Sequence, residues 1–177
     1  IAFENNDRPG IMLAGALRAY ANRWGVAVGR KVAVFTNNED GLRTASDLKA
    51  KGLEVRVIDA RKGEEVVDCS GRLGLKSITI RRNGSTETFA CDALGVSGGW
   101  NPNVNITSHH RSRPVWDESI AAFVPRTDNP AGLTAAGAAS GAMSTHGALA
   151  TGQAQAISAL ADLGINAAAD SLPQAED

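Results

Sequence analysis

The stretch from residue 31 to residue 58 constrains the fold more than any other part of the sequence. It opens with a short apolar run, residues 31–35, of the kind that forms a buried parallel strand. Apolar residues at helical spacing follow over 40–51, and an alternating, β-branched run comes next over 53–58. Strand, helix and strand together have about 30 residues, the size of a dinucleotide-binding half-motif. The sequence therefore predicts an α/β fold with a parallel sheet.

The loop after the first of these strands departs from a dinucleotide-binding pattern. A Rossmann loop carries three glycines, for a tight turn, for close approach of the pyrophosphate and for helix packing. The equivalent positions are Thr36, Asn38 and Gly41, so only the packing glycine is present, and the Asn38 side chain would project toward the pyrophosphate. Asp59 ends the second strand, where an acid holds the ribose hydroxyls, and Arg61 follows. Asp59 could equally cap a nearby turn, so a binding and a non-binding loop both stay open.

Further strands and a helix are predicted on either side of this unit. Residues 75–82 and 86–90 alternate around Asn83-Gly84, which is a strong hairpin signal. Residues 91–97 are typical of a strand that returns to the sheet. Residues 9–25 begin with Pro-Gly, continue with apolar residues at helical spacing and end at a glycine, so we expect a helix there.

The C-terminal part predicts irregular chain, two strands and a long helix. Residues 107–117 are polar and irregular, whereas 119–124 and 132–136 are short apolar runs expected to form strands. An Ala-rich helix is expected over 141–163. The small, acidic residues 166–177 are expected to form a mobile tail.

The junction at Gly137 is a second candidate for contact with a nucleotide. A strand that ends here and is followed by a helix aims backbone N–H groups at any anion near Gly137. The residues leave open a tight strand–helix turn without a ligand.

Composition and residue spacing exclude several classes of function. A formal net charge of -1 argues against a nucleic-acid partner, and no apolar run approaches the ~20 residues of a membrane-spanning helix. Cys69 and Cys91 lie far apart without CxxC spacing, so we expect reduced thiols in a cytosolic protein. His109 and His110 have no Cys or carboxylate at ligand spacing, so we expect no metal site.

Four segments, in this order along the chain, resemble the alpha subunits of heterotetrameric sarcosine oxidases. They are residues 3–16 (FENNDRPGIMLAGA), 19–26 (AYANRWGV), 96–103 (VSGGWNPN) and 114–117 (PVWD). The resemblance runs across about residues 1–160.

This resemblance implies a Rossmann-like NAD(P)-binding domain inserted into a partial FAD/NAD(P)-binding domain. Residues 29–105 would be the inserted domain. Residues 1–28 and 106–163 would belong to the outer, interrupted domain, with 164–177 as a flexible tail. The glycine-rich loop of the outer domain would then precede Ile1, and the Ile start suggests a piece excised from a longer chain.

The resemblance also implies where a nucleotide is contacted. Gly99 lies where the chain crosses back between the domains, and Gly137-Ala138 matches the Gly-Asp pair that these proteins use near the cofactor phosphates and ribitol. Ala138 cannot accept the flavin hydrogen bonds that the Asp accepts. NAD is therefore the expected cofactor of the intact subunit, with FAD and FMN elsewhere in the complex. The candidate cofactor contacts are Pro9, Gly10, Asn38, Gly41, Asp59, Gly99, Gly137 and Ala138.

For function, the resemblance implies part of a cytoplasmic complex of several subunits that oxidises sarcosine to glycine, formaldehyde and hydrogen peroxide. The amine-oxidising flavin would be on another subunit, so we expect no catalytic residue here and no activity of the chain alone. One alternative is the alpha subunit of a related amine, proline or opine dehydrogenase complex, which would lack a folate-dependent aminomethyltransferase-like C-terminal domain. The other is a scaffold for subunit assembly whose nucleotide loop has decayed.

Overall fold

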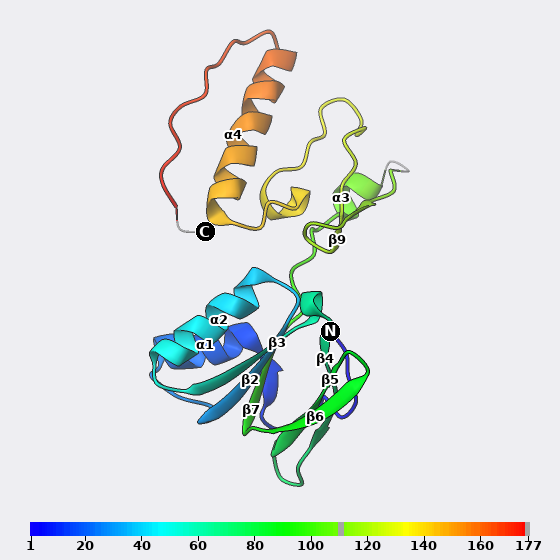
Figure 1. The fold of residues 1–177 in the computed structure, drawn as a ribbon. Coiled ribbons are helices and arrows are strands. Elements are labelled where there is room, and N and C mark those ends of the chain that lie inside the picture. Colours follow the sequence, from blue (N-terminus) through cyan, green and yellow to red (C-terminus); the bar gives the residue numbers. More distant parts are fainter. Residues whose placement is uncertain (110–111, 176–177) are drawn as a thin grey trace. The chain divides into compact units, whose positions relative to one another are not determined.

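The computed structural model describes residues 1–109 and 112–175 (Figure 1). The chain forms two compact units, Ile1–Gly99 (unit 1) and Trp100–Asp177 (unit 2). No helix in the described ranges has the length and apolar character needed to cross a membrane.

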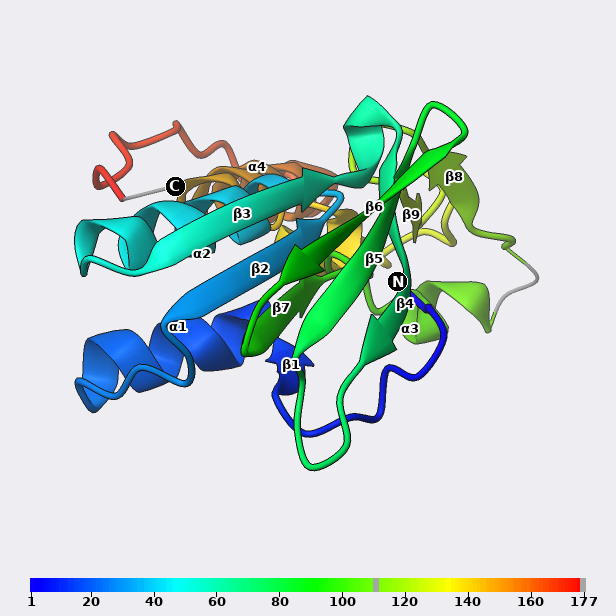
Figure 2. The ribbon, with the colours of Figure 1, turned by 60° about the horizontal axis from the view of Figure 1, so that its bottom comes forward.

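Unit 1 is built on a four-stranded parallel sheet in the order β1-β7-β2-β3. Its strands are β1 (Ile11–Leu13), β2 (Lys31–Thr36), β3 (Glu54–Asp59) and β7 (Ala93–Ser97). The arrowheads of β2, β3 and β7 point the same way in Figure 2. The predicted α/β fold with a parallel sheet is confirmed. The strands predicted over 31–35, 53–58 and 91–97 are confirmed as β2, β3 and β7.

Two helices, α1 (Ala14–Arg23) and α2 (Glu39–Ala50), cover one face of this sheet. Strand β2 alternates, so that Val32 and Val34 join the cluster under the helices, whereas Ala33 and Phe35 join the cluster on the other face. The helix predicted over 40–51 is confirmed within one residue at either end.

The helix expected from residue 9 begins later, at Ala14. Residues Ile11–Leu13 instead form β1, which pairs in parallel with β7, Ile11 lying opposite Leu94. The apolar residues from Ala14 onward form the expected helix. Residues 11–13 are extended instead, because their backbone pairs with the edge of the sheet. Tertiary context overrides local pattern in this way wherever a sheet edge would otherwise stay unpaired.

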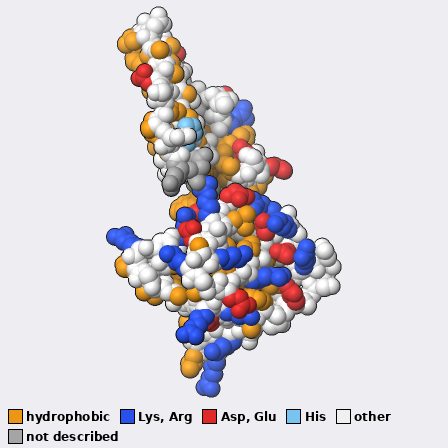
Figure 3. Space-filling model, turned by 60° about the vertical axis from the view of Figure 1, so that its left-hand side comes forward, with side chains coloured by type: hydrophobic (Ala, Val, Ile, Leu, Met, Phe, Trp, Pro, Cys, Tyr) orange, Lys and Arg blue, Asp and Glu red, His pale blue; other side chains and the backbone are white. Residues whose placement is uncertain are grey.

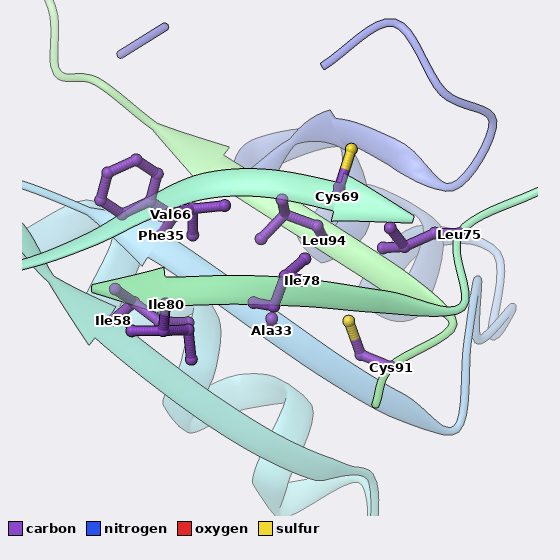
Figure 4. Close-up of a cluster of buried hydrophobic side chains, with 10 residues drawn as sticks. All are labelled: Ala33, Phe35, Ile58, Val66, Cys69, Leu75, Ile78, Ile80, Cys91 and Leu94. Carbon is purple, nitrogen blue, oxygen red and sulfur yellow. The ribbon is translucent and has the colours of Figure 1, made fainter. Parts of the chain in front are cut away.

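A three-stranded antiparallel sheet packs on the other face of the parallel sheet. It consists of β4 (Glu64–Ser70), β5 (Ser77–Arg82) and β6 (Ser85–Ala90), and follows the short 3-10 helix η1 (Ala60–Lys62). The predicted hairpin is confirmed as β5–β6. Figure 4 shows the core between the two sheets, which includes Phe35, Ile58, Ile78, Ile80 and Leu94 and both cysteines.

Strand β4 was not predicted. Its register with β5 shifts between Val66 and Asp68, and the shift breaks the period-2 alternation that marks a strand in sequence. Only Val66 and Cys69 of its residues are buried, and its three apolar residues, Val66, Val67 and Cys69, lie in an acidic stretch without a period-2 pattern.

Unit 2 contains fewer regular elements. They are α3 (Asn105–Ser108), the antiparallel pair β8 (Val115–Asp117) and β9 (Ala122–Val124), the 3-10 helix η2 (Gly137–Ser140) and α4 (Thr145–Asp162). The irregular segment expected over 107–117 therefore contains β8. The strand expected from 119 begins only at Ala122, because Ala121 has a φ of 49°, which interrupts an extended chain.

Two further predictions for unit 2 are wrong. Residues 132–136 form no strand, since no described strand lies beside them to supply hydrogen bonds. The Ala-rich helix starts at Thr145 rather than 141, because Gly141 has a φ of 99° and the Ser144 hydroxyl caps the helix by accepting from Gly147 N–H. Residues 166–175 contain no helix or strand, and 176–177 lie outside the described residues.

The described part of unit 2 has almost no core. Its buried residues are Pro102, Thr107 and Ala122, and α4 has none at all. Leu149 of α4 is 38% exposed, and hydrophobic side chains lie open along this part of the surface in Figure 3. An apolar helix of a globular domain normally buries one face, so the apolar face of α4 is unpartnered within the described residues.

The compact units do not follow the expected divisions at residues 28 and 105. Strand β1 and helix α1 belong to unit 1, since β1 pairs with β7 and α1 packs with the sheet and α2. The unit then ends at Gly99, directly after β7, rather than at residue 105.

Candidate dinucleotide site

The carboxyl ends of three parallel strands meet at one edge of unit 1. Strand β2 ends at Thr36, which lies opposite Ser97 of β7 on one side and Asp59 of β3 on the other. Ligands of open α/β sheets bind at this edge, outside the carboxyl ends of the strands. Asn38, Gly41 and Asp59 all lie here, as the sequence predicts.

Asn38 is fully engaged with protein atoms. Its Oδ1 accepts from Gly41 N–H at 3.2 Å and from the Ser97 hydroxyl at 3.0 Å, and its Nδ2 donates to Ser97 O at 3.0 Å. The Thr36 hydroxyl donates to Asn38 O at 2.9 Å and accepts from Asn38 N–H at 3.1 Å. Asn38 therefore caps α2 and binds it to the end of β7, using one of the first-turn N–H groups that a phosphate would use.

Gly41 provides the close packing that its position in the pattern predicts. A Cβ at this position would overlap the Thr36 side chain and would lie 3.1 Å from Ser97 Cβ. The absence of a side chain is what allows α2 to approach β2 and β7 this closely.

Asp59 is buried, with a relative exposure of 1%, and is held by Arg61. Its Oδ1 accepts from Arg61 N–H at 3.1 Å and from Nε at 3.0 Å, and its Oδ2 accepts from Nη2 at 2.9 Å. The Arg61 hydrogen bonds hold the pKa of Asp59 below its usual value, despite burial, which acts in the opposite direction. Both carboxylate oxygens thus accept hydrogen bonds from Arg61, and the bond from Arg61 N–H is the turn cap that the sequence left open. Ribose binding at Asp59 stays a prediction.

Two residues of this edge were missed by sequence reasoning. Glu39 accepts from Arg61 Nη1 at 2.6 Å and so joins the start of α2 to the end of β3. Ser97 supplies the partner for Asn38 from β7. Ser97 could have been identified because it ends the return strand, whereas the Glu39 contact depends on the path of the chain after β3.

Gly99 lies near Asn38 at the same edge, but Pro9 and Gly10 do not. A Cβ on Gly99 would lie 3.6 Å from Asn38 Nδ2. Pro9 and Gly10 precede β1, and their carbonyls accept from Leu75 N–H at 2.8 Å and Leu94 N–H at 2.9 Å. They therefore lie at the amino ends of the strands, across the sheet from Asn38.

Gly137 and Ala138 belong to unit 2, where they begin η2 rather than a long helix. Gly137 has a φ of 61°, its N–H donates to the Thr151 hydroxyl at 2.9 Å, and its carbonyl accepts from the Ser140 hydroxyl at 2.9 Å. Thr151 and Ser140 also line a cavity of about 270 Å3. Asn129, another lining residue, has a buried Oδ1 with no hydrogen-bond donor among the described residues.

The described residues contain no cluster of His, Cys, Asp and Glu that could hold a metal ion. His109 ends α3, and His110 lies outside the described residues. Cys69 and Cys91 are both buried and unpaired.

The fold is similar to that of a solved dehydrogenase structure. The crystal structure of L-proline dehydrogenase from P. horikoshii is similar over 95% of this chain and 33% of that one, with a TM-score of 0.68 and 23% identity. At this identity, the similarity defines a mixed α/β fold with a parallel sheet. No family model matches the chain.

Curated relatives identify the family. The chain is 37% identical over 93% of its length to the sarcosine oxidase subunit alpha of Rhizobium meliloti (strain 1021). It is 42% identical over 87% of its length to that of Corynebacterium sp. (strain U-96), and 39% over 99% to that of Corynebacterium sp. (strain P-1). The chain spans 18–21% of the length of these relatives. It is homologous to one segment of sarcosine oxidase alpha subunits, which confirms the resemblance.

Proposed function

We propose that the chain is part of the alpha subunit of an oxidoreductase complex that oxidises sarcosine, with oxygen and water, to glycine, formaldehyde and hydrogen peroxide. The observation that carries this proposal is the identity of 37–42% to sarcosine oxidase alpha subunits over 87–99% of the chain. In this proposal the chain supplies no catalytic residue, because the amine-oxidising flavin belongs to another subunit.

Unit 1 has a structural role in this proposal and does not bind a dinucleotide through its own loop. Asn38 uses the Gly41 N–H at the start of α2, and Arg61 uses both carboxylate oxygens of Asp59. A nucleotide would have to break these charged and capping hydrogen bonds, at about 1–3 kcal/mol each, before it gained any contact. This closed edge supports the scaffold alternative for unit 1.

NAD is held on the side of unit 2, around Gly137 and Ala138, once further chain completes that unit. Support comes from the apolar helix α4, which has no buried residue, and from residues 132–136, which form no strand with any described residue. Unit 2 is, in this proposal, the remainder of an outer domain into which unit 1 is inserted. The Ala138 methyl group cannot accept a hydrogen bond from flavin, so FAD and FMN bind elsewhere in the complex.

The partners of the chain are the other subunits of this complex, because its relatives are named as one subunit of sarcosine oxidase. The complex is cytosolic, a placement supported by two cysteines that stay unpaired.

The test is purification of the complex that contains this subunit, followed by assay with sarcosine, proline and an opine. We expect equal amounts of formaldehyde and hydrogen peroxide from sarcosine, and NAD released from the subunit on denaturation. Oxidation of proline or an opine in preference to sarcosine would favour a related dehydrogenase instead. The 177-residue chain alone should oxidise none of the three.

A further inference from the structure

The amino edge of the parallel sheet in unit 1, opposite the nucleotide edge, carries an exposed apolar surface. Helix α1 ends here with Tyr20 and Trp24, whose rings lie 5.4 Å apart and are 43% and 57% exposed. Val26 follows at 48%. A hydrogen bond fixes this segment, since Val26 N–H donates to Tyr20 O at 3.0 Å. The apolar groups are therefore held in place.

Beside Trp24 the surface is hollowed. A cavity of about 260 Å3 is lined by Ala21, Gly25, Val26, Ala27, Lys51 and Leu53. It is smaller than the roughly 300–1,000 Å3 of small-molecule sites, so it suits a single apolar side chain better than a cofactor.

The same edge carries cations without carboxylate partners. The exposed cations Arg23, Arg30, Lys49 and Lys51 form no ion pair with any described residue, and the Arg23 guanidinium lies 5.3 Å from the centre of the Trp24 ring. The acids at the starts of the strands are already engaged. Asp92 accepts from the backbone N–H groups of Arg30 and Lys31, and Glu54 pairs with Lys31 Nζ at 2.9 Å. Figure 3 brings this side forward and shows basic and acidic side chains over unit 1 with hydrophobic side chains open between them.

Helix C-termini explain part of this charge, since Arg23 and Lys49 lie in the last turns of α1 and α2 and compensate their dipoles. The helix ends do not account for Arg30, which lies in the loop before β2, or for the exposed Trp24. Large aromatic side chains beside unpaired cations are typical of a protein interface rather than of a solvated edge.

We propose that this amino-edge surface, made by Arg23, Trp24, Val26, Arg30 and Lys51, binds an acidic segment of another subunit of the complex. An apolar side chain of that segment fills the cavity beside Trp24, and its carboxylates face the cations at the rim. The inference rests on the proposed membership of a complex of several subunits, and it adds which face of the chain makes the contact. The nucleotide edge, across the sheet, stays clear of this partner.

The test uses the full-length subunit and the purified remaining subunits, with the dissociation constant measured by interferometry at two salt concentrations. Two variants change the surface: Trp24→Ala, and Arg23→Glu combined with Lys51→Glu. Arg43→Glu is the matched control, because Arg43 is an exposed cation of α2 outside this surface and without an ion pair in the described residues. Circular dichroism verifies that all variants are folded. If Trp24→Ala does not fold, the double variant Arg23→Glu with Lys51→Glu still tests the surface, because both of its side chains are exposed.

We expect each surface variant to weaken association roughly tenfold or more, and the control less than about twofold. Association should weaken with salt in the wild type, and less so in the charge-reversed variant. Assembly that responds to neither surface variant would overturn this inference and leave the proposed function standing. Failure of the wild-type subunit to assemble with any partner would overturn both. Self-association of the subunit that Trp24→Ala abolishes, without effect on partners, would show a second copy as the occupant and would also overturn it.

Discussion

Individual side chains at the carboxyl edge of unit 1 satisfy one another's hydrogen bonds. Asn38 stands at the position of the pyrophosphate glycine and caps α2, and Arg61 neutralises the acid at the ribose position. The sequence predicts the positions of Asn38 and Asp59, because Asn38 replaces a glycine of the loop pattern and Asp59 is an acid at the end of a strand. The partners could not be predicted, because Ser97 and Glu39 reach the edge from distant segments.

Replacement of Asn38 should destabilise unit 1. Asn38→Ala removes the α2 cap and the hydrogen bonds to Ser97, and we expect a loss of about 1–3 kcal/mol in the free energy of unfolding. Urea unfolding followed by circular dichroism measures it. Asn101→Ala is the control, at an exposed amide whose side chain makes no hydrogen bond with any described residue, and should change stability by less than about 0.5 kcal/mol. Equal effects of the two changes would contradict the structural role of Asn38.

The Asp59–Arg61 contact should make stability depend on pH. The pKa of Asp59 is lower in the folded chain, so the folded state gains stability above the unfolded pKa of about 3.9. That gain is lost as pH falls through the lower folded value. Asp59→Asn should therefore reduce stability by about 1–3 kcal/mol near pH 7, with a difference from wild type that shrinks in acid. Glu65→Gln, which breaks an exposed pair with Arg81, should have little effect at any pH.

At the scale of elements, local pattern predicts those parts of unit 1 in which one face is uniformly buried. Strand β2 and helix α2 were found because their apolar residues follow one period without interruption. Strand β4 was missed because a register shift interrupts the alternation, and β1 was taken for helix because three residues cannot display a strand period. The sequence could not show that residues 132–136 form no strand, because a strand needs a hydrogen-bonded partner and the sequence does not reveal whether one lies beside it.

The packing of α2 against the sheet predicts opposite effects for two helical glycines. Gly41→Ala should destabilise the chain by about 1–3 kcal/mol, because its Cβ would overlap Thr36. Gly15→Ala, in α1, meets no atom within 4 Å and should stabilise by roughly 0.5–1 kcal/mol through helix propensity. Thermal unfolding of both variants measures the change in stability relative to the wild type. Stabilisation by Gly41→Ala would contradict the close packing of α2.

At the scale of the whole molecule, the two units differ in how much they bury. Unit 1 has a core on each face of its sheet, whereas the described part of unit 2 has scattered buried residues and a helix without any. Hydrogen exchange should therefore be slowest in β2 and β7 and faster by orders of magnitude in α4. Mass spectrometry of the deuterated chain measures this, and α4 amides protected as strongly as those of β2 would show that unit 2 needs no further chain.

The central claim is that unit 1 keeps the fold of a nucleotide domain while NAD binds on the side of Gly137. Calorimetric titration of NAD into the intact full-length subunit tests it, with Asp59→Ala and Gly137→Val compared side by side. Val strains a backbone at φ 61°, so we expect Gly137→Val to weaken NAD binding roughly tenfold or more, and Asp59→Ala to leave it within about twofold. Loss of binding in Asp59→Ala, with normal binding in Gly137→Val, would contradict the account.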